Sequence, residues 1–499
     1  MDANGSRRNE DPYLRLGVRP FINCCSVRTI HGGSLMLPEV KAAMAEASKR
    51  YVNVYELMEQ AGDRLAELTG AGWGFVTCGS AAAVCLAAAG SVAGNDPEKI
   101  LRLPNTEGMK NRVIIPKGQR FAYDHAIRMT GARIIEVESR AELVREFDSG
   151  LVAMVCVLGT NEHKGKLRLE EIAAEARPRR IPILVDAASE HISRPDPWLG
   201  RGANMVIYSG GKFLRGPQTT GLLLGDRDCV RAAWANASPH QGLGRPMKVS
   251  KEDIVGIVTA VEYWFGERDH KAEEKKWQDD LATIAAALKS NPAVTTKILE
   301  PHDVVRVPRL VIGWDQPKLP LTGVDLWRAL LDGEPRVMVD DMDASEASIQ
   351  IDPFGIQPGE AKAVGARVAE VLAQKAKATP AVQPSPSQLK LAGTWSVKIA
   401  FLNGEAAHVL TLKQDGQSLS GTHKTQFAEN AVEGEVSGNR IRLHSRHPYE
   451  GTRLSYRFEG EAKEGALAGT LTLGTSGVHA GPINESQHGS APWSATRAG

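Results

Sequence analysis

The sequence lacks several features that would assign it to a class at once. Among its 499 residues, no run approaches the roughly 20 apolar residues that a membrane helix needs. Residues Met1 to Asn9 are polar, so we expect no secretory signal. The six cysteines stand at irregular positions without a CxxC pair, which is typical of reduced thiols and predicts a cytoplasmic protein.

Charge and phosphate-binding loops are also scarce. The formal net charge is +1, which provides no general attraction to nucleic acid or to an anionic membrane and argues against both as partners. Neither GxxxxGK(S/T) nor GxGxxG occurs. His408, His423, His444 and His447 have no zinc-site spacing with cysteines, so we expect surface side chains on strands and no metal site.

One segment of unusual composition divides the chain. Residues 376–388 contain three prolines among small and polar residues, which predicts a semi-rigid linker. Before it we expect a large α/β domain over residues 1–249 and a small α+β domain over residues 250–375. After it, residues 389–499 alternate between polar and apolar with short turns, which predicts about eight strands in a faintly lipocalin-like antiparallel β-barrel.

The large domain has the pattern of a mostly parallel sheet. Apolar runs alternate with helical stretches such as Leu169–Arg177, as in sheets covered by helices on both faces. Two helices come first, one from Pro38 with Tyr51 on its apolar face, and one from about Glu56 to Gly70. The expected strands are Gly74–Cys78, Val113–Ile115, Ile134–Val137, Val152–Leu158, Ile183–Asp186, Met205–Tyr208 and Leu222–Leu224, with Val304–Val311 and Ser348–Ile351 in the small domain. Ligands of such sheets bind beyond the carboxyl ends of the strands.

A lysine follows one of these strand ends. Lys212 comes after Met205–Tyr208 through Ser209-Gly-Gly, and the two glycines let the backbone turn and approach a bulky ligand. A lysine that forms a Schiff base must be partly desolvated to be neutral and nucleophilic, and a strand end in a closed cleft provides that environment. The same tetrapeptide also suits a surface lysine in a glycine turn.

Asp186 favours the catalytic interpretation. It ends the strand Ile183–Asp186, and Lys212 follows 26 residues later, after the next strand, so both would face one cleft. A carboxylate there can pair with the pyridinium nitrogen of pyridoxal 5′-phosphate and keep the ring able to accept carbanion electrons. An aspartate that caps the turn after its strand is the alternative.

A third segment could hold the phosphate of such a cofactor. Thr77–Ala83 follows a strand and opens a helix of small residues. Backbone amides around Gly79 and Ser80 at the helix N-terminus form a natural phosphate cradle. A tightly packed alanine-rich helix is compatible with this function.

Other candidates are single side chains. His125 opens another helix and can stack on the cofactor ring, or it can be a helix-capping or hydrogen-bonded core histidine. Arg245 and Lys248 can hold an anionic substrate group, with arginine offering bidentate geometry, or they can belong to a solvated loop. Gln119 and Arg120 are lesser candidates for the same cleft.

Residues 11 to about 374 resemble the fold-type-I pyridoxal-phosphate enzymes related to bacterial selenocysteine synthase (L-seryl-tRNA selenium transferase). Within that group they are most similar to the branch that contains D-glucosaminate-6-phosphate ammonia-lyase. The matching segments are Phe21–Asn23, Tyr51–Leu57, Thr77–Ala83, Asp124–Arg128, Val185–Glu190, Ser209–Lys212, Gly216–Gln218 and Arg245–Val249.

The resemblance implies roles for the candidates. Lys212 would carry the internal aldimine, Asp186 would be the pyridinium partner, and Gly79, Ser80 and Ser209 would hold the phosphate. The resemblance also implies a homodimer or larger assembly with active sites near the subunit interfaces. In the selenium transferases, cations at the positions of the Arg245 segment, Lys248 included, handle the small anionic selenium or sulfur donor.

The hypothesis from the sequence is therefore a cytoplasmic pyridoxal-phosphate lyase of the dehydratase or ammonia-lyase type. It would act through an external aldimine on a small hydroxy-amino acid or amino-sugar acid, with Lys212 or a nearby base removing the Cα proton. Racemase or aldolase chemistry on the same intermediate is an alternative, as is transfer to seryl-tRNA or another carrier. A non-catalytic binding protein would require the lysine, the aspartate and the phosphate cradle to be vestigial.

Overall fold

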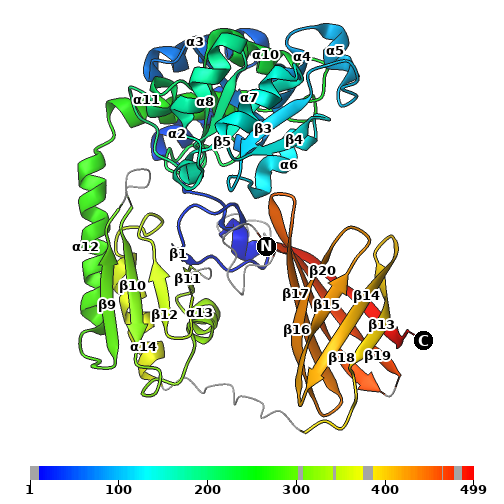
Figure 1. Ribbon diagram of the computed structural model, residues 1–499. Helices are drawn as coiled ribbons and strands as arrows, with labels where there is room; N and C mark the ends of the chain where they lie inside the picture. The colour runs from blue at the N-terminus through cyan, green and yellow to red at the C-terminus, as the bar shows by residue number, and fades with distance from the viewer. Residues whose placement is uncertain are drawn as a thin grey trace, which may run out of the picture. The chain divides into compact units, whose positions relative to one another are not determined.

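The computed structural model describes residues 11–301, 307–340, 344–374, 386–463, 465–476 and 486–498 (Figure 1). The chain divides into two compact units, one of Met1–Asp340 with Ala344–Ala376, the other of Lys377–Gly499 with Asp341–Asp343. The polar N-terminal residues and most of the predicted linker, residues 376–385, lie outside the described ranges. Within those ranges, no helix combines the length and apolar character needed to cross a membrane, and no cluster of three or more metal-ligating side chains occurs.

A seven-stranded sheet forms the larger part of the first unit. Its order is β2-β8-β7-β6-β5-β3-β4. The neighbours from β7 to β4 pair in parallel, and β8 pairs antiparallel with β7 and β2. The strands are β2 Trp73–Thr77, β3 Arg112–Pro116, β4 Arg133–Val137, β5 Val152–Leu158, β6 Ile183–Asp186, β7 Met205–Ser209 and β8 Gly221–Gly225. The mostly parallel sheet predicted from the sequence is confirmed.

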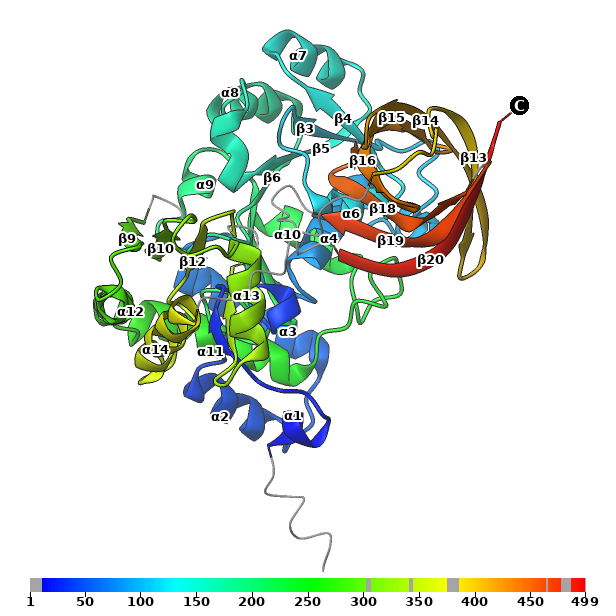
Figure 2. The same cartoon turned by 90° about the horizontal axis from the view of Figure 1, so that it is seen from below.

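Helices cover both faces of this sheet. Figure 2 shows α8 (Leu169–Ala176) and α9 (Pro197–Gly200) on one side of β5 and β6, with α4 (Ser80–Ala93) and α6 (His125–Arg128) on the other. α4 is buried almost all round, because its alanines and glycine allow close packing. The remaining helices are α1 Pro12–Arg15, α2 Pro38–Ala47, α3 Val54–Thr69, α5 Pro97–Arg102, α7 Arg140–Asp148, α10 Arg227–Ala235 and α11 Lys251–Gly266.

The two predicted N-terminal helices are present with one difference. α2 begins with Pro38 at its first position, and α3 ends at Gly70 in the left-handed conformation, both as expected. α2 stops at Ala47, however, so Tyr51 lies beyond the helix and is fully exposed. The apolar spacing that suggested a longer helix did not reveal this early end.

A smaller α+β part has its own core. β9 (Val294–Leu299), β10 (Arg309–Trp314) and β12 (Ser348–Ile351) form an antiparallel sheet in the order β12-β10-β9. β1 (Ile22–Cys24) pairs in parallel with β11 (Val337–Val339). The helices are α12 His270–Leu288, α13 Gly323–Asp332 and α14 Glu360–Ala373. Of the predicted strand Val304–Val311, residues 304–306 are outside the described ranges, and the observed strand continues to Trp314.

The larger core extends past the expected boundary at residue 249. The apolar side chains Ile254, Ile257 and Val261 of α11 belong to the core of the large sheet, because α11 packs against α2 and α3. The core of the smaller part begins with Leu281 in α12 and also includes Cys24. By side-chain packing, α11 therefore belongs with the large part rather than the small one.

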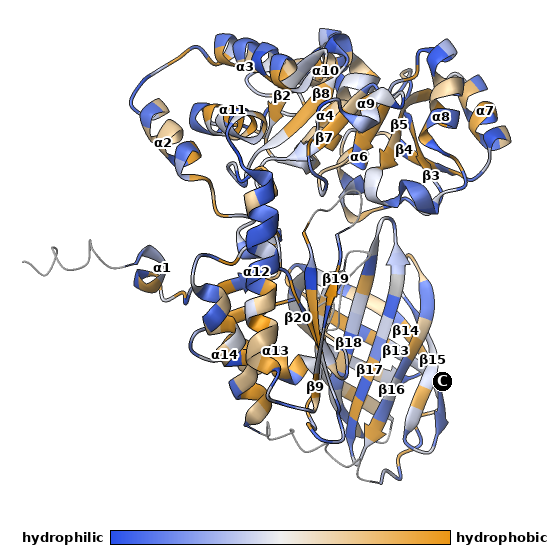
Figure 3. Ribbon diagram, turned by 90° about the vertical axis from the view of Figure 1, so that its left-hand side faces the viewer, coloured by the Kyte–Doolittle hydropathy of each residue, from blue (hydrophilic) through white to orange (hydrophobic). Residues whose placement is uncertain are grey.

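The second unit contains a closed barrel of eight antiparallel strands in sequence order, as predicted. The strands are β13 Gly393–Phe401, β14 Gly404–Asp415, β15 Ser418–Lys424, β16 Glu429–Ser437, β17 Arg440–Tyr449, β18 Thr452–Lys463, β19 Ala466–Ser476 and β20 Ser486–Arg497. Figure 3 shows apolar and polar residues alternating along these strands. Alternate side chains such as Trp395, Val397 and Ile399 fill the interior.

The expectation of surface histidines in the barrel is wrong for two of the four. His408 is 7% exposed and His423 is completely buried. Both lie in phase with inward-facing residues, His408 with Leu410 on β14 and His423 with Leu419 on β15. His444 is partly buried, and the side chain of His447 is outside the described set.

Candidate active site

The candidate site lies at the carboxyl ends of the central strands. Asp186 is the last residue of β6 and pairs with Leu158 of β5 and Ile207 of β7. Ser209 ends β7, and Lys212 follows three residues later. The side chains that the sequence assigned to one cleft are therefore carried by neighbouring strand ends, where ligands of parallel sheets bind.

Lys212 is partly buried and Asp186 is buried, and each affects the pKa of the other. Burial lowers the pKa of Lys212, and the nearby charge of Asp186 opposes this shift. Burial likewise raises the pKa of Asp186, against the backbone N–H of Ala188, which donates to Oδ1 at 3.0 Å, and the charge of Lys212. The charge of each side chain therefore favours the charged form of the other, in a region where burial disfavours an isolated charge.

The backbone around Lys212 is held in place by glycine contacts. The N–H of Gly210 donates to Thr220 O at 2.9 Å, and the N–H of Ser34 donates to Gly211 O at 2.9 Å. A Cβ atom on Gly211 would lie 2.3 Å from the Cα of Gln218, so only glycine fits there. Gly210 and Gly211 therefore allow the predicted sharp turn and also let the backbone pack closely against Gln218.

The residue after Lys212 anchors the same loop. The ring of Phe213 stacks on that of His191 with centroids 4.1 Å apart, and it meets the ring of Phe354 edge-on at 5.3 Å. Arg268 Nη1 donates to Phe213 O at 2.6 Å. Because Phe354 follows β12, the smaller part of the unit reaches the lysine loop and helps to fix it.

Gly221 brings the candidate phosphate cradle together. This first residue of β8 pairs with Thr77 at the end of β2 and with Ser209 at the end of β7. A Cβ atom on Gly221 would lie 2.5 Å from Gly79 C and 2.6 Å from Ser80 N, so the β2–α4 loop passes directly over it. The structure therefore places Gly79, Ser80 and Ser209 around one residue.

The N-terminus of α4 is suited to an anion. Gly79 has φ 84° and ψ 160°, and no side chain caps the helix. The first N–H groups of this 14-residue helix point out of its N-terminus, where the helix dipole favours negative charge. A phosphate group is the ligand that this arrangement fits best.

His125 lies beyond the end of β3, on the same edge of the sheet. It begins α6, is exposed, and has Nδ1 3.4 Å from Arg128 Nη2. Its neighbour Asp124 and the catalytic candidate Asp186 both raise the pKa of the buried Cys156 thiol, after burial itself. His125 therefore begins its helix close to the β5–β6 region, and the accessible ring is free to meet a ligand.

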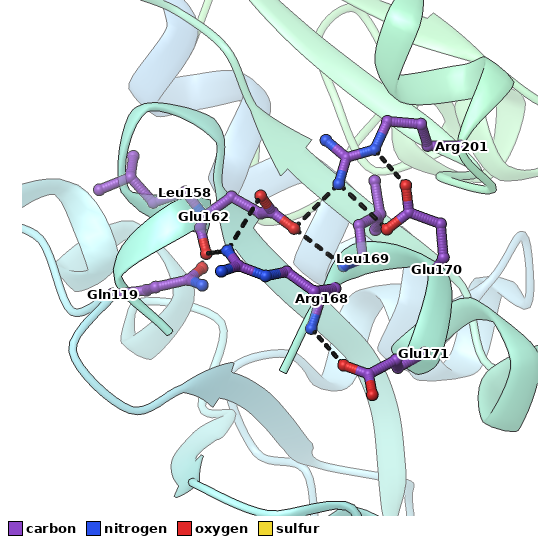
Figure 4. Close-up of polar contacts among 8 residues, drawn as sticks. All are labelled: Gln119, Leu158, Glu162, Arg168, Leu169, Glu170, Glu171 and Arg201. Carbon is purple, nitrogen blue, oxygen red and sulfur yellow. Dashed lines mark hydrogen bonds and ion pairs between the residues drawn. The ribbon is translucent and has the colours of Figure 1, made fainter. Parts of the chain in front are cut away.

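Gln119 is more closely tied to the site than its minor place in the sequence analysis suggests. Its side chain is completely buried, and Oε1 accepts a hydrogen bond from the N–H of Leu158 at 3.1 Å (Figure 4). Its Nε2 has no hydrogen-bond partner within the described residues. This amide donor thus lies at the end of β5, directly beside the strand that carries Asp186.

Hydrogen bonds and ion pairs of the buried Glu162 hold the loop that follows β5. Glu162, in the 3-10 helix Gly159–Lys164, accepts hydrogen bonds from the N–H of Leu169 at 3.0 Å and from Arg201 Nη2 at 2.9 Å. Arg168 Nη1 donates to the backbone oxygen of Glu162 at 3.2 Å. Figure 4 shows these contacts joining the loop to the start of α8. The edge of the sheet beside Asp186 is therefore rigidly supported.

Arg245 and Lys248, the predicted substrate-binding cations, form no hydrogen bond or ion pair with Lys212, Asp186 or Ser80 among the described residues. Arg245 Nη1 donates to Ser238 Oγ at 3.4 Å, and Lys248 is exposed. Among the described residues, neither forms an ion pair. Gly244 packs against Leu86, in the second turn of α4, so the segment runs along that helix.

Glu190, at the end of the segment Val185–Glu190, had no role predicted from the sequence, and the structure shows that it is buried near Asp186. It is 7% exposed, and its Oε2 accepts a hydrogen bond from Trp198 Nε1 at 2.7 Å. Burial, assisted by the charges of Asp186 and Asp196, raises the pKa of Glu190 to about 7. The signal in the sequence was only its spacing, four residues after Asp186.

Comparisons with known proteins agree with this geometry. No family model matches the chain. The 5′-C-glycyluridine monooxygenase-decarboxylase of a Streptomyces species is 30% identical over 373 residues, covering 72% of this chain and 92% of its own length. The D-glucosaminate-6-phosphate ammonia lyase of Salmonella typhimurium is 29% identical over 369 residues, covering 72% and 97%. This chain belongs to the selenocysteine synthase-related family of fold-type-I pyridoxal-phosphate enzymes.

Two further similarities support the same family. A solved structure of D-glucosaminate-6-phosphate ammonia-lyase matches with a TM-score of 0.66 and 28% identity, covering 74% of this chain and all of that one. The L-seryl-tRNA(Sec) selenium transferase of Moorella thermoacetica is 25% identical over 287 residues, covering 50% of this chain and 57% of its own. This member of the family is a pyridoxal-phosphate-dependent enzyme, as the sequence predicted.

The site fits the cofactor of the family. The uncapped helix N-terminus at Ser80 suits a phosphate, and a Cβ atom on Gly221 would displace the backbone of Gly79 and Ser80 that forms this terminus. The buried carboxylate of Asp186 is stabilised by a cationic partner, which a protonated pyridine nitrogen would provide. Lys212, next to Asp186 and with a lowered pKa, is the amine at hand for covalent attachment.

Proposed function

We propose that this pyridoxal-phosphate enzyme is a lyase that releases ammonia from an amino-sugar acid or a small hydroxy-amino acid. The observation that carries the proposal is the electrostatic pairing of the partly buried Lys212 with the buried Asp186, beyond neighbouring strand ends. The ammonia-lyase relative, which aligns over 97% of its own length, supports this reaction class. The near-neutral charge of the chain favours a small molecule over a tRNA.

The cofactor, when bound, supplies a ring that accepts negative charge from the substrate Cα. The residues of the chain would position the cofactor and the substrate and would hold or remove protons. Asp186 would hold a proton on the ring nitrogen, and Gly79, Ser80 and Ser209 would hold the phosphate. Lys212 would take the proton from Cα, because burial favours its neutral amine.

The accessible side chains would orient the substrate. The exposed ring of His125 would stack on the cofactor, while the buried Gln119, which accepts from the N–H of Leu158, would hold the end of β5 in position. Arg245 and Lys248 would bind the anionic group of the substrate. Neither side chain forms an ion pair among the described residues, which leaves both cations available for such a group.

We also propose that the enzyme is a cytoplasmic homodimer or larger assembly. Tyr51, Val52 and Tyr55 are large apolar side chains exposed near the start of α3, as expected of a surface that a second copy covers. No disulfide joins the six cysteines, all of which lie within the described residues, and this suits a reducing compartment. Sedimentation analysis that finds only monomers at micromolar concentration would contradict the assembly.

The function is tested by measuring ammonia and 2-oxo acid formation. The purified holoenzyme should be incubated with D-glucosaminate 6-phosphate, D-glucosaminate, and the D and L forms of serine and threonine. We expect one amino-sugar acid or hydroxy-amino acid to give equal amounts of ammonia and 2-oxo acid, and Lys212→Ala to give neither. A product that is only the epimer of the substrate, or an aldehyde with glycine, would contradict the lyase.

A further inference from the structure

The interior of the β-barrel is packed at one end and hollow at the other. Near the linker end it is filled by apolar side chains that are at most 3% exposed, among them Trp395, Leu412, Leu419, Val436, Ile441 and Leu467. At the opposite end there is a cavity of about 460 Å³. Its walls are mainly apolar and include Phe401, Leu454, Leu473 and Ala491, with Tyr456 among the lining residues. A pocket of this size is typical of small-molecule sites.

Polar groups are buried next to this cavity. His408 Nδ1 lies 2.9 Å from His423 Nε2, so the two imidazoles share a hydrogen bond inside the barrel. The ring of Tyr456, which lines the cavity, has its centroid 5.7 Å from that of His408 and 5.0 Å from that of His423. Burying imidazoles costs free energy that a leucine pair would avoid. Packing alone therefore does not account for them.

The mouth of the cavity is also unusual. β13, β15 and β17 end on the same side of the barrel, because the strands alternate in direction. Within the described part of the barrel, the exposed large apolar side chains are Leu402, Phe427 and Tyr449, and each lies at or next to the hairpin that follows one of these strands. Leu402 lines the cavity itself. The end of the barrel that contains the cavity therefore also carries these exposed apolar side chains.

We propose that the barrel binds one small, uncharged, mainly apolar molecule in this cavity, with a hydrogen-bonding group directed toward Tyr456. Burial raises the pKa of the Tyr456 hydroxyl, which keeps it neutral and able to donate. Among the described residues, the lining contains no carboxylate, ammonium or guanidinium group, and its imidazole, His488, is an exposed side chain near the start of β20. A charged ligand would therefore have no permanently charged partner in this lining. The site is independent of the pyridoxal-phosphate site and of its reaction.

Equilibrium dialysis of the full-length holoenzyme against N-phenyl-1-naphthylamine, an uncharged aromatic amine, tests the proposal. We expect one molecule bound per chain. Ala491→Trp places a large side chain in the cavity wall and should weaken binding at least 10-fold. Ser494→Trp adds the same side chain to the exposed face of the same strand and should leave binding unchanged. Competition should show displacement by 1-octanol and none by octanoate at equal concentration.

Three results would overturn the proposal. The first is no stoichiometric binding to the wild type. The second is equal binding by both tryptophan variants, which would place the probe elsewhere. The third is stronger displacement by octanoate than by 1-octanol, because this would require a charged ligand. If thermal melting shows that Ala491→Trp does not fold, Leu473→Trp on the neighbouring strand replaces it with the same expected loss.

Discussion

Glu190 should make the stability of the first unit depend on pH in a defined window. Its carboxyl is buried against Trp198 and close to Asp186, and a Cβ atom on Gly159 would lie only 2.3 Å from its Oε1. The charged form is therefore disfavoured in the folded protein. Glu190→Gln keeps the shape and the acceptor for the indole N–H but removes the titration.

The magnitude follows from the pKa. A rise in the pKa of Glu190 from 4.5 to about 7 corresponds to about 3 kcal/mol in total, of which about 2.5 kcal/mol falls between pH 5 and pH 8. The folded state binds the proton more tightly than the unfolded state. The stabilisation is therefore present at low pH and is lost as the pH rises toward 7.

The assay is urea unfolding of the cofactor-free protein, followed by circular dichroism at 222 nm. All the helices of the described ranges precede residue 375, so this signal reports the first unit. Relative to Glu190→Gln, the wild type should lose about 2.5 kcal/mol of unfolding free energy from pH 5 to pH 8. A constant difference between the two proteins, or a relative gain by the wild type, would refute the reasoning.

Three further predictions concern the site and the units. Gly221→Ala should raise the dissociation constant for pyridoxal phosphate at least 10-fold in titrations of the apoprotein, because its Cβ would meet Ser80 N. The control Gly200→Ala, whose Cβ meets no atom within 4 Å, should leave the dissociation constant unchanged. Equal affinities of the two variants would contradict the phosphate cradle. Asp186→Asn should still bind cofactor but lose most exchange of the substrate Cα proton in deuterated water, and near-normal exchange would refute its role. A chain ending at Ala378 should fold, bind the cofactor and keep its assembly state, and an insoluble or colourless product would mean that the boundary is wrong.

The large sheet could be predicted from the sequence because its strands are buried on both faces. Val152–Leu158 and Ile183–Asp186 are uninterrupted apolar runs, and the structure reproduces both bounds. β1 was not predicted, since a strand of three residues carries no periodicity. α11 has a clear apolar face, but a face does not reveal which core it joins.

The candidate site could be predicted from the sequence only where its residues directly follow predicted neighbouring strands. Lys212 and Asp186 follow predicted strands, so their proximity could be anticipated. The contact of Gly221 with Gly79 depends on β8 lying between β2 and β7, an order that the sequence does not specify. The inward positions of His408 and His423 depend on barrel register in the same way, because a shift of one residue would turn both outward.

The most direct test of the whole interpretation is the site of covalent cofactor attachment. The holoenzyme should be reduced with borohydride, digested, and examined by peptide mass spectrometry. We predict a single reduced pyridoxal-phosphate adduct on Lys212, lost in Lys212→Ala, because this partly buried amine has a lowered pKa and interacts with the charge of Asp186. An adduct on any other lysine would contradict the assignment of the active site.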